Sequence, residues 1–409
     1  MFDLVDLLKN KETQPAKEEK LTSVLFHQTE ACRELVEEAF RFEGITTPAI
    51  LNNNDDNIRQ HVRESTIEIV LVELNESSNV TKDMEHISHL LPNSASVIVI
   101  GSEDAISTIR NLKAMGFYYL FWPITKTELI DFVRNVNENR LRNSGLGKNR
   151  SAKKVAVLGA KGGVGVSLLT AELSKELSEK RNSSCVIVDH NFSGGNLDIM
   201  LGLKQFKKRE VAPGALTASL DAGYASNMAT KVNGMLSLLA IESDDLSDAQ
   251  LKEYARTLSA QLASQTNFII EDLSGSTSSK ADLEYIASQA DVVLLVTEPT
   301  VSSLRDATRV MNVLQEKNST ARCIIVVNHT KPEKCATVEL PEIEKYLHQS
   351  VDVVCPFEPK LGKTLLRGEN IYTQKMPVSN SFSQITSLLL GEAIKPTKES
   401  LLKRLTQRA

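Results

Sequence analysis

Short apolar runs alternate with amphipathic stretches through most of this chain. In its first part the runs are rich in Val, Ile and Leu, and each is followed by apolar positions that recur at helical spacing. Strands that alternate with helices form a parallel sheet covered on both faces. The predicted strands are Ser23–Phe26, Thr47–Leu51, Ile67–Leu74, Val97–Ile100 and Tyr118–Phe121. The predicted helices are Thr29–Phe42, Asn57–Glu64, Asp83–Leu91, Glu103–Met115 and one after Pro123.

The alternation resumes after residue 153, so the predicted fold class is α/β with two doubly wound parallel-sheet domains. At 409 residues the chain is long enough to bury two cores. A polar, basic and glycine-containing stretch near residues 139–151 indicates a linker. The predicted division is an amphipathic tip with a flexible tether (1–20), a first domain (21–140), the linker (141–152), a second domain (153–390) and a basic amphipathic tail (391–409).

The second domain opens with a strand, a glycine-rich turn and a helix. Residues 153–167 read KKVAVLGAKGGVGVS, and an amphipathic stretch follows. Gly162, Gly163 and Gly165 allow positive φ, so several N–H groups can point at one anion at a helix N-terminus. Ser167 stands where such loops give a hydroxyl to magnesium. The predicted phosphate-binding residues are Lys161, Gly162, Gly163, Val164, Gly165, Val166, Ser167 and Leu168.

This loop departs from the usual GxxxxGK[ST] pattern at two positions. Ala160 replaces the first glycine, and Val166 replaces the lysine that reaches the β- and γ-phosphates. Lys161 still supplies a positive charge beside the phosphates. The alternative interpretation is a tight strand-to-helix turn that binds nothing.

Composition narrows the function classes. A net charge of −5 provides no overall positive field for a phosphate backbone, so we expect no nucleic-acid partner. The five cysteines are scattered without CxxC spacing, which argues against a disulfide framework and against a zinc site. No apolar run is long enough to span a bilayer, and the N-terminus lacks a signal-peptide pattern, so we expect a cytoplasmic protein.

The first domain resembles a response-regulator receiver, a flavodoxin-type fold. Receivers hold magnesium and a phosphoacceptor aspartate in an acidic pocket, completed by a lysine. Here His27 and Gln28 replace the acidic pair, Glu73 stands at the phosphoacceptor position, and Trp122 replaces the lysine before the proline. Without the acidic pair nothing would hold the metal. We therefore expect an interaction domain that is not phosphorylated, with Trp122 packed at a domain or dimer face.

The second domain resembles the deviant Walker group that includes ParA and MinD. The matching segments are the lysine-led glycine loop, the strand ending in Asp189 with HNFSGGNLD after it, FIIED at 268–272, ADVVLLVTEPTVSSLRDA at 290–307, IIVVNHT at 324–330 and VVCPFEPKLGKTLLRGENI at 353–371. Together they cover about residues 153–377. The resemblance implies a P-loop fold that binds ATP and Mg²⁺.

The same resemblance implies individual roles. Lys161 matches the signature lysine that crosses to the nucleotide of a partner subunit in a homodimer, and is the candidate catalytic residue. Ser167 and Asp272 would face magnesium, and Asn328 would contact adenine. Asn191 replaces the acid that positions the attacking water. With Val166 and Asn191 each removing one electrostatic group, ATP binding is expected, with hydrolysis weak or absent.

Four residues near these motifs are weighed for a role at this site. His190 and His329 stand at strand ends, where lone histidines are usually surface residues. For Asp189 and Asp198 two alternatives stay open. They are structural residues of a turn and a switch loop, or they face the metal.

A degenerate receiver joined to a ParA/MinD-like domain resembles the TadZ/CpaE family of Flp (Tad) pilus assembly. That resemblance implies a dimeric localisation factor at a cell pole or patch that recruits pilus assembly proteins. The tail 395–409, with Leu401, Leu402 and Leu405 among basic residues, is a candidate for peripheral contact with the inner membrane, against the alternative of a solvated helix. The other functional alternatives are an active MinD/ParA-like positioning ATPase and a nucleotide-free scaffold.

Overall fold

The structure is a computed structural model that describes residues 21–64, 67–93, 95–141, 151–213, 220–275 and 279–392. The predicted tip and tether (1–20), nearly all of the predicted linker (141–152) and nearly all of the predicted tail (391–409) lie outside the described residues. Among the described residues no helix is both long enough and apolar enough to cross a membrane.

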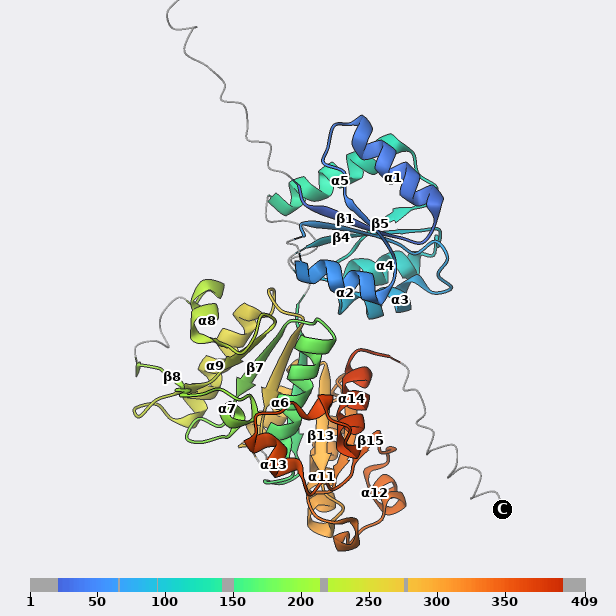
Figure 1. Ribbon diagram of the computed structural model, residues 1–409. Helices are drawn as coiled ribbons and strands as arrows, with labels where there is room; N and C mark the ends of the chain where they lie inside the picture. Colours follow the sequence, from blue (N-terminus) through green and yellow to red (C-terminus); the bar gives the residue numbers. More distant parts are fainter. Residues whose placement is uncertain are drawn as a thin grey trace, which may run out of the picture.

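The N-terminal domain is built on a five-stranded parallel sheet with the order β2-β1-β3-β4-β5, the flavodoxin-like order. Helices α1 and α5 cover one face, and α2, α3 and α4 cover the other (Figure 1). The strands are β1 (Ser23–His27), β2 (Ala49–Asn52), β3 (Ile69–Glu73), β4 (Ser96–Gly101) and β5 (Tyr118–Phe121). The helices are α1 (Glu30–Phe42), α2 (Asp55–Glu64), α3 (Val80–Ser88), α4 (Ile106–Ala114) and α5 (Lys126–Leu141).

Burial on both faces explains the continuous apolar runs of this sheet. In β3, Val70 and Val72 pack in the cluster beneath α2 and α3, whereas Ile69 and Leu71 pack with α1 and α5. Successive side chains of a strand point to opposite faces, so a strand covered on both sides must be apolar at every position. The predicted strands and helices of this domain are all present, with their ends shifted by a few residues.

The C-terminal domain is built on an eight-stranded sheet with the order β15-β14-β13-β6-β12-β7-β10-β9. Its strands are β6 (Lys153–Gly159), β7 (Cys185–Asp189), β9 (Thr230–Lys231), β10 (Leu236–Leu239), β12 (Phe268–Asp272), β13 (Val292–Thr297), β14 (Arg322–Asn328) and β15 (Val353–Cys355). A separate pair joins β8 (Arg209–Glu210) to β11 (Ile241–Glu242).

The edge of this sheet corrects the expectation of a wholly parallel sheet. Strand β9 runs antiparallel to β10, so the sheet is mixed, while the fold class of two α/β domains is confirmed. The edge strand escapes the sequence pattern because it consists of two residues, Thr230 and Lys231, and neither is apolar.

Helices pack on both faces of the larger sheet (Figure 1). They are α6 (Val166–Lys175), α7 (Leu197–Met200), α8 (Ala222–Met228), α9 (Asp248–Leu262), α10 (Lys280–Gln289), α11 (Val301–Glu316), α12 (Leu340–Leu347), α13 (Leu361–Leu366) and α14 (Pro377–Leu389). Helix α6 follows the glycine-rich turn and is the most deeply buried, because it lies between the sheet and α14. A π-helical segment, Glu176–Lys180, continues it.

The N-terminal domain contacts the C-terminal domain where the strands of the larger sheet begin. Asn267, directly before β12, donates from Nδ2 to the Leu91 carbonyl at 3.0 Å. Ser183, ahead of β7, donates to the His89 carbonyl at 3.1 Å, and the His89 ring stacks on Phe268. The glycine-rich turn follows the other end of β6, so the nucleotide-site candidates lie away from this contact.

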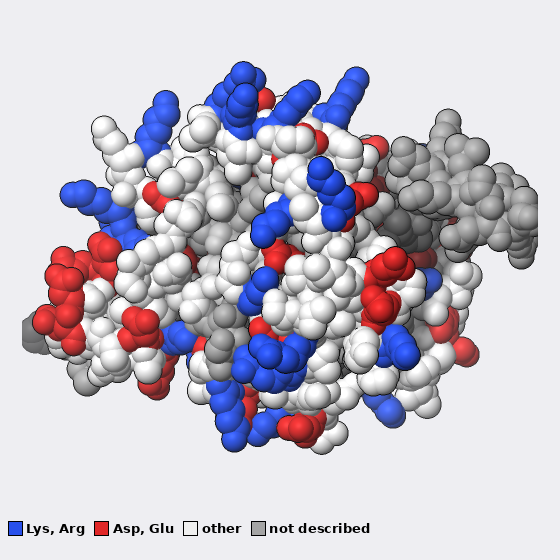
Figure 2. Space-filling view, turned by 90° about the horizontal axis from the view of Figure 1, so that it is seen from below, with Lys and Arg blue, Asp and Glu red and all other residues white. Residues whose placement is uncertain are grey.

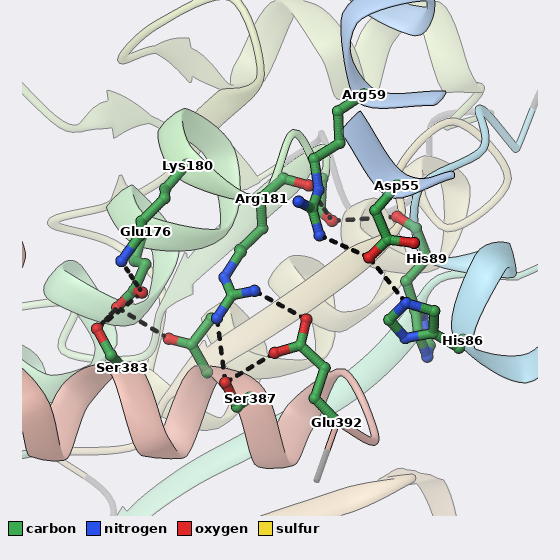
Figure 3. A network of polar contacts seen from close by, with 12 residues as sticks. Asp55, Arg59, His86, His89, Glu176, Lys180, Arg181, Ser383, Ser387 and Glu392 are labelled. Carbon is green, nitrogen blue, oxygen red and sulfur yellow. Dashed lines mark hydrogen bonds and ion pairs between the residues drawn. The ribbon is translucent and has the colours of Figure 1, made fainter. Parts of the chain in front are cut away.

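A network of charged and polar side chains lies beside the domain contact (Figure 3). Arg181, after the π-helical segment, donates to Glu392 at 2.8 Å and to Ser387 at 3.0 Å. In the N-terminal domain, Asp55 pairs with His86 at 3.0 Å, and this hydrogen bond, reinforced by Arg59 and Arg181 charges, holds the pKa of Asp55 below its usual range against burial. The network extends the contact between the domains from α6 to α2 and α3.

Asn267 provides a test of this contact. Its Oδ1 accepts from the backbone N–H and the hydroxyl of Ser184 at 3.0 and 2.6 Å, and it is 8 % exposed. Asn267→Ala should lower the free energy of unfolding by about 1–3 kcal/mol, because the half-buried N–H of Ser184 and the Leu91 carbonyl each lose a hydrogen bond. Urea unfolding followed by circular dichroism measures it. Ser102→Ala, at an exposed position, should change the value by less than about 0.5 kcal/mol; an equal effect would contradict the assignment.

Candidate functional site

The glycine-rich turn adopts the backbone conformation that phosphate binding requires. Gly163 and Gly165 have φ of 81° and 97°, and Gly165 is the N-cap of α6. A Cβ at Gly165 would lie 2.6 Å from Nδ2 of Asn328, so only glycine fits there. Gly162 and Gly163 are exposed. The turn therefore presents backbone N–H groups at the start of a buried helix, which is an anion-binding arrangement.

Val166 belongs to the hydrophobic core and not to the surface of the loop. Its side chain is 4 % exposed and packs with Val164 in the cluster under α6. A Cβ on Gly159 would lie 2.6 Å from Val164 and 3.0 Å from Val166, so the two valines fill the space against the end of β6. Val166 can offer its backbone N–H to a phosphate, but it supplies no charge there.

Lys161 is paired within its own chain. Its Nζ lies 2.9 Å from Oε2 of Glu298, which follows β13. The other carboxylate oxygen of Glu298 accepts a hydrogen bond from the Thr330 hydroxyl. Burial opposes ionisation of Glu298, but Thr330 and Lys161 together hold its pKa below the usual range. The loop lysine is therefore linked through Glu298 to the segment after β14.

Asn328, at the end of β14, contacts the loop directly. Its Nδ2 donates to the Val164 carbonyl at 2.8 Å. The adenine-side strand implied by resemblance thus touches the phosphate loop, as a site that holds both ends of one nucleotide requires. Asn328 is half-buried, and its neighbour His329 is half-buried as well.

Two carboxylates meet at the carboxyl ends of neighbouring strands. Asp189 of β7 is in register with Asp272 of β12. Asp272 is fully buried, and burial raises its pKa although Ser274 and Ser167 donate toward it. Its Oδ2 has no hydrogen-bond partner among the described residues. Burial also raises the pKa of Asp189 to about 7, against the opposing charge of Lys208.

This arrangement fits a magnesium ion. Hard cations select oxygen ligands, and a buried carboxylate oxygen that lacks a partner is costly unless a cation or a donor meets it. Ser167 and Asp272 would hold the ion, with Asp189 facing the same space. Among the described residues no group of three or more His, Cys, Asp or Glu side chains forms an all-protein metal site. An ion here would therefore share its coordination with phosphate oxygens and water.

Lys208 enters the site from a loop that sequence reasoning passed over. Its ammonium lies 3.7 Å from Oδ2 of Asp189 and donates to the carbonyls of Asn191 and Gly194. Asn191 also donates from its backbone N–H to Asp189 at 2.9 Å. Asn191 lies within van der Waals reach of a Cβ on Gly275, so the two loops after β7 and β12 approach closely. Lys208 fixes the loop that carries Asn191.

The interpretation of His190 as a surface residue is wrong. The ring is 2 % exposed, both of its nitrogens lack hydrogen-bond partners among the described residues, and burial lowers its pKa to about 3. The residue points away from Asp189 because neighbours along a strand face opposite sides of the sheet. There it packs near Glu271 and Phe192. His190 is a neutral core residue behind the site.

Figure 2 shows the molecule from the end opposite the N-terminal domain. Lysine, arginine and acidic side chains are mixed on this face, which carries no continuous patch of one charge.

Asp198, the remaining candidate, is half-buried in α7, and its backbone carbonyl accepts from Leu203 N–H at 2.9 Å. Nothing in its contacts places its carboxylate against Asp272.

In the N-terminal domain, Glu73 is fully buried and fully hydrogen-bonded. Its oxygens accept from Gln28 N–H at 2.7 Å, from Thr29 N–H and hydroxyl at 2.9 and 2.6 Å, and from Asn75 Nδ2 at 2.8 Å. The carboxylate thus holds the turn just before α1, whose N-cap is Thr29. That it takes no phosphate stays a prediction. Trp122 is half-buried and packs with the cluster beneath α1 and α5.

Fold and loop together define a P-loop fold. No family model matches the chain. It is 27% identical over 249 residues to the septum site-determining protein MinD of Helicobacter pylori, across 59% of this chain and 91% of that protein. The C-terminal domain is similar to the ParA/MinD family of deviant Walker A ATPases, and the N-terminal α/β region is additional to it.

Two solved structures show the same likeness. The MinC:MinD cell division protein complex of Aquifex aeolicus is 25% identical with a TM-score of 0.48, over 60% of this chain and 99% of that one. MinD of Pyrococcus horikoshii, complexed with Mg-ADP, is 18% identical with a TM-score of 0.45, over 58% and 96%. The names of these relatives refer to cell division and septum placement. They give no support to the expected role in pilus assembly.

Asp189 generates a pH prediction. An aspartate that titrates near pH 4 in the unfolded chain and about 7 here binds its proton more tightly when folded. That contribution to stability is complete below about pH 4 and is lost as pH rises through about 7. Asp189→Asn should therefore melt higher than the wild type at pH 8, with the difference vanishing toward pH 4. A difference in melting temperature that is independent of pH would contradict this.

Glu73 generates a second prediction. Glu73→Ala should lower the free energy of unfolding by about 2–4 kcal/mol, because four hydrogen bonds from half-buried donors to one buried carboxylate are lost. Glu76→Ala, at an exposed neighbour, should change it by less than about 0.5 kcal/mol. Intact-mass spectrometry after incubation with acetyl phosphate should show no added phosphate on the wild type. A phosphate on Glu73 would overturn the interpretation.

Proposed function

We propose that this protein is an ATP-binding positioning factor of the MinD/ParA kind, in which nucleotide stabilises pairing of two copies and hydrolysis is slow. One observation carries the proposal: the left-handed glycine turn at α6 adjoins Ser167 and Oδ2 of buried Asp272, an oxygen that has no hydrogen-bond partner within the described ranges. The turn offers N–H groups to phosphate, and the carboxylate offers an oxygen to magnesium.

Each part of the nucleotide has a matching group. The N–H groups of residues 162–168 would bind the phosphate oxygens, and Asn328 would contact the base. Bound magnesium supplies charge neutralisation at the phosphates. Ser167 and Asp272 would hold and orient that ion, and the buried aliphatic packing of Val164 and Val166 keeps the loop rigid beneath it.

Slow turnover follows from two replacements. Phosphoryl transfer depends on positioning and on stabilising developing charge. Val166 supplies no charge to the phosphates, and Asn191 cannot act as a carboxylate toward water. Loss of one such donor commonly costs about 10²- to 10³-fold in rate. Binding energy would then set the population of the pair more than hydrolysis does.

The proposed pairing rests on Lys161. In the family that this domain resembles, the lysine of this position reaches the nucleotide of the partner subunit. The Lys161 side chain is 34 % exposed and follows the carboxyl end of β6, whereas the N-terminal domain contacts the other end of the sheet. This exposure supports a contact with a second copy.

Two other functions remain alternatives. An active MinD/ParA-like positioning ATPase is favoured by the match to MinD over 91% of its length. A nucleotide-free scaffold is favoured by the internal bonds of Lys161 and Asn328, which already occupy both groups. Recruitment of pilus assembly proteins, and membrane contact through residues 395–409, stay hypotheses drawn from resemblance.

One experiment separates these functions. The wild type should melt at a higher temperature with saturating Mg-ATP, with a smaller shift for ADP, and should release phosphate slowly. Lys161→Ala should lose ATP-dependent dimerisation in sedimentation velocity. Rapid phosphate release that depends on Lys161 would favour the active ATPase. No ATP shift and no heat in calorimetry would leave the scaffold and overturn the proposal.

A further inference from the structure

Lys161 is the only charged residue between Gly159 and Leu168. Val166 replaces the usual second lysine of the loop, so Lys161 is the residue of this segment that can offer a positive charge to a phosphate. Its ammonium lies 2.9 Å from Glu298, whose side chain is 14 % exposed. The one positive charge of the loop is therefore already neutralised by an acid from the other side of the site.

We propose that Glu298 is a positioning residue that restrains Lys161, so that the lysine must leave this carboxylate before it binds phosphate. The proposal rests on the proposed function, because it concerns the same nucleotide site. Glu298 and a triphosphate offer the same chemistry to an ammonium, namely anionic oxygens. They compete for one cation, so the ion pair lowers nucleotide affinity by the free energy of breaking it.

Glu298 is held in place by its own neighbours. Its backbone N–H lies 3.0 Å from the Ser303 hydroxyl, and its carbonyl accepts from Thr300 N–H at 2.7 Å. Its Oε1, the carboxylate oxygen that does not pair with Lys161, accepts a hydrogen bond from the Thr330 hydroxyl. The carboxylate is thus fixed at the end of β13 by both backbone and side-chain bonds, and the flexible partner in the ion pair is Lys161.

Thr330 connects this restraint to the base side of the site. It lies two residues after Asn328, which contacts the Val164 carbonyl of the loop. A nucleotide base that displaced the contact of Asn328 with Val164 would shift the segment that carries Thr330. The hydrogen bond from Thr330 to Glu298 would then be disturbed as well. Binding at the base end would thereby help to release Lys161 at the phosphate end.

The size of the effect follows from exposure of the pair. Lys161 is 34 % exposed, so solvent screens the interaction, and ion pairs of this kind change an equilibrium by about 2- to 5-fold. A homodimer contains two such pairs. If both must open, the dimerisation constant changes by about 4- to 25-fold, the square of the single effect.

The test is Glu298→Gln in the full chain. The amide keeps the shape and can still accept from Thr330, but it loses the charge. Calorimetry with Mg-ATP should show about 2- to 5-fold tighter binding than the wild type, and sedimentation should show dimer at lower ATP. Glu333→Gln, an exposed acid on the neighbouring loop, is the matched control and should change neither.

A double variant separates restraint from a structural role. In Lys161→Ala protein, Glu298→Gln should leave ATP affinity unchanged, because the group that it restrains is gone. An equal effect of Glu298→Gln with and without Lys161, or weaker ATP binding in Glu298→Gln alone, would overturn the restraint while leaving the proposed function intact. No binding in either the wild type or Glu298→Gln would overturn both.

Discussion

The meeting of Asp189 and Asp272 at the ends of adjacent parallel strands is the constraint around which the site is built. Register between β7 and β12 fixes the two carboxylates side by side, and both are buried. Charged oxygens in such a place are costly unless cations or donors meet them. Lys208 and the backbone N–H of Asn191 meet Asp189, but Oδ2 of Asp272 is left with no partner among the described residues. The fold therefore creates a demand for a cation beside the glycine turn.

The positively charged side chains of this site stand at positions other than that of the usual loop lysine. The usual loop lysine is replaced by core-forming Val166, and the positive charges near the turn belong to Lys161 and Lys208, each already paired with an acid. In the proposed function, nucleotide and metal would therefore compete with these internal partners, whereas in a loop with a free lysine they would not. Such competition weakens binding but makes occupancy sensitive to whatever changes the internal pairs, which suits a switch better than a rapidly turning-over enzyme.

Sequence reasoning found what local patterns determine. Apolar periodicity predicts the strands and helices, and glycine spacing predicts the turn, because both depend on neighbours in the chain. It failed for His190, whose side of the sheet is set by the strand register, and for β9, whose pairing residues carry no apolar pattern. It passed over Lys208 and Glu298, because their roles arise when distant loops approach. A positively charged residue on the loop after NLD, and an acid directly after a buried strand, were the available signals.

Helix α6 connects the nucleotide-site candidates to the domain contact. Ser167 stands in its first turn, and farther along Glu172 accepts from Ile371 N–H at 2.9 Å while fully buried. The π-helical continuation brings Glu176 to Ser383 and then Arg181 to the network beside α2 and α3. Buried acids that are fully hydrogen-bonded resist displacement, since leaving their donors costs the full desolvation penalty. Helix α6 and its π-helical continuation therefore form a stiff element. The glycine turn and the domain contact lie at its two ends, so a displacement at one end is transmitted to the other.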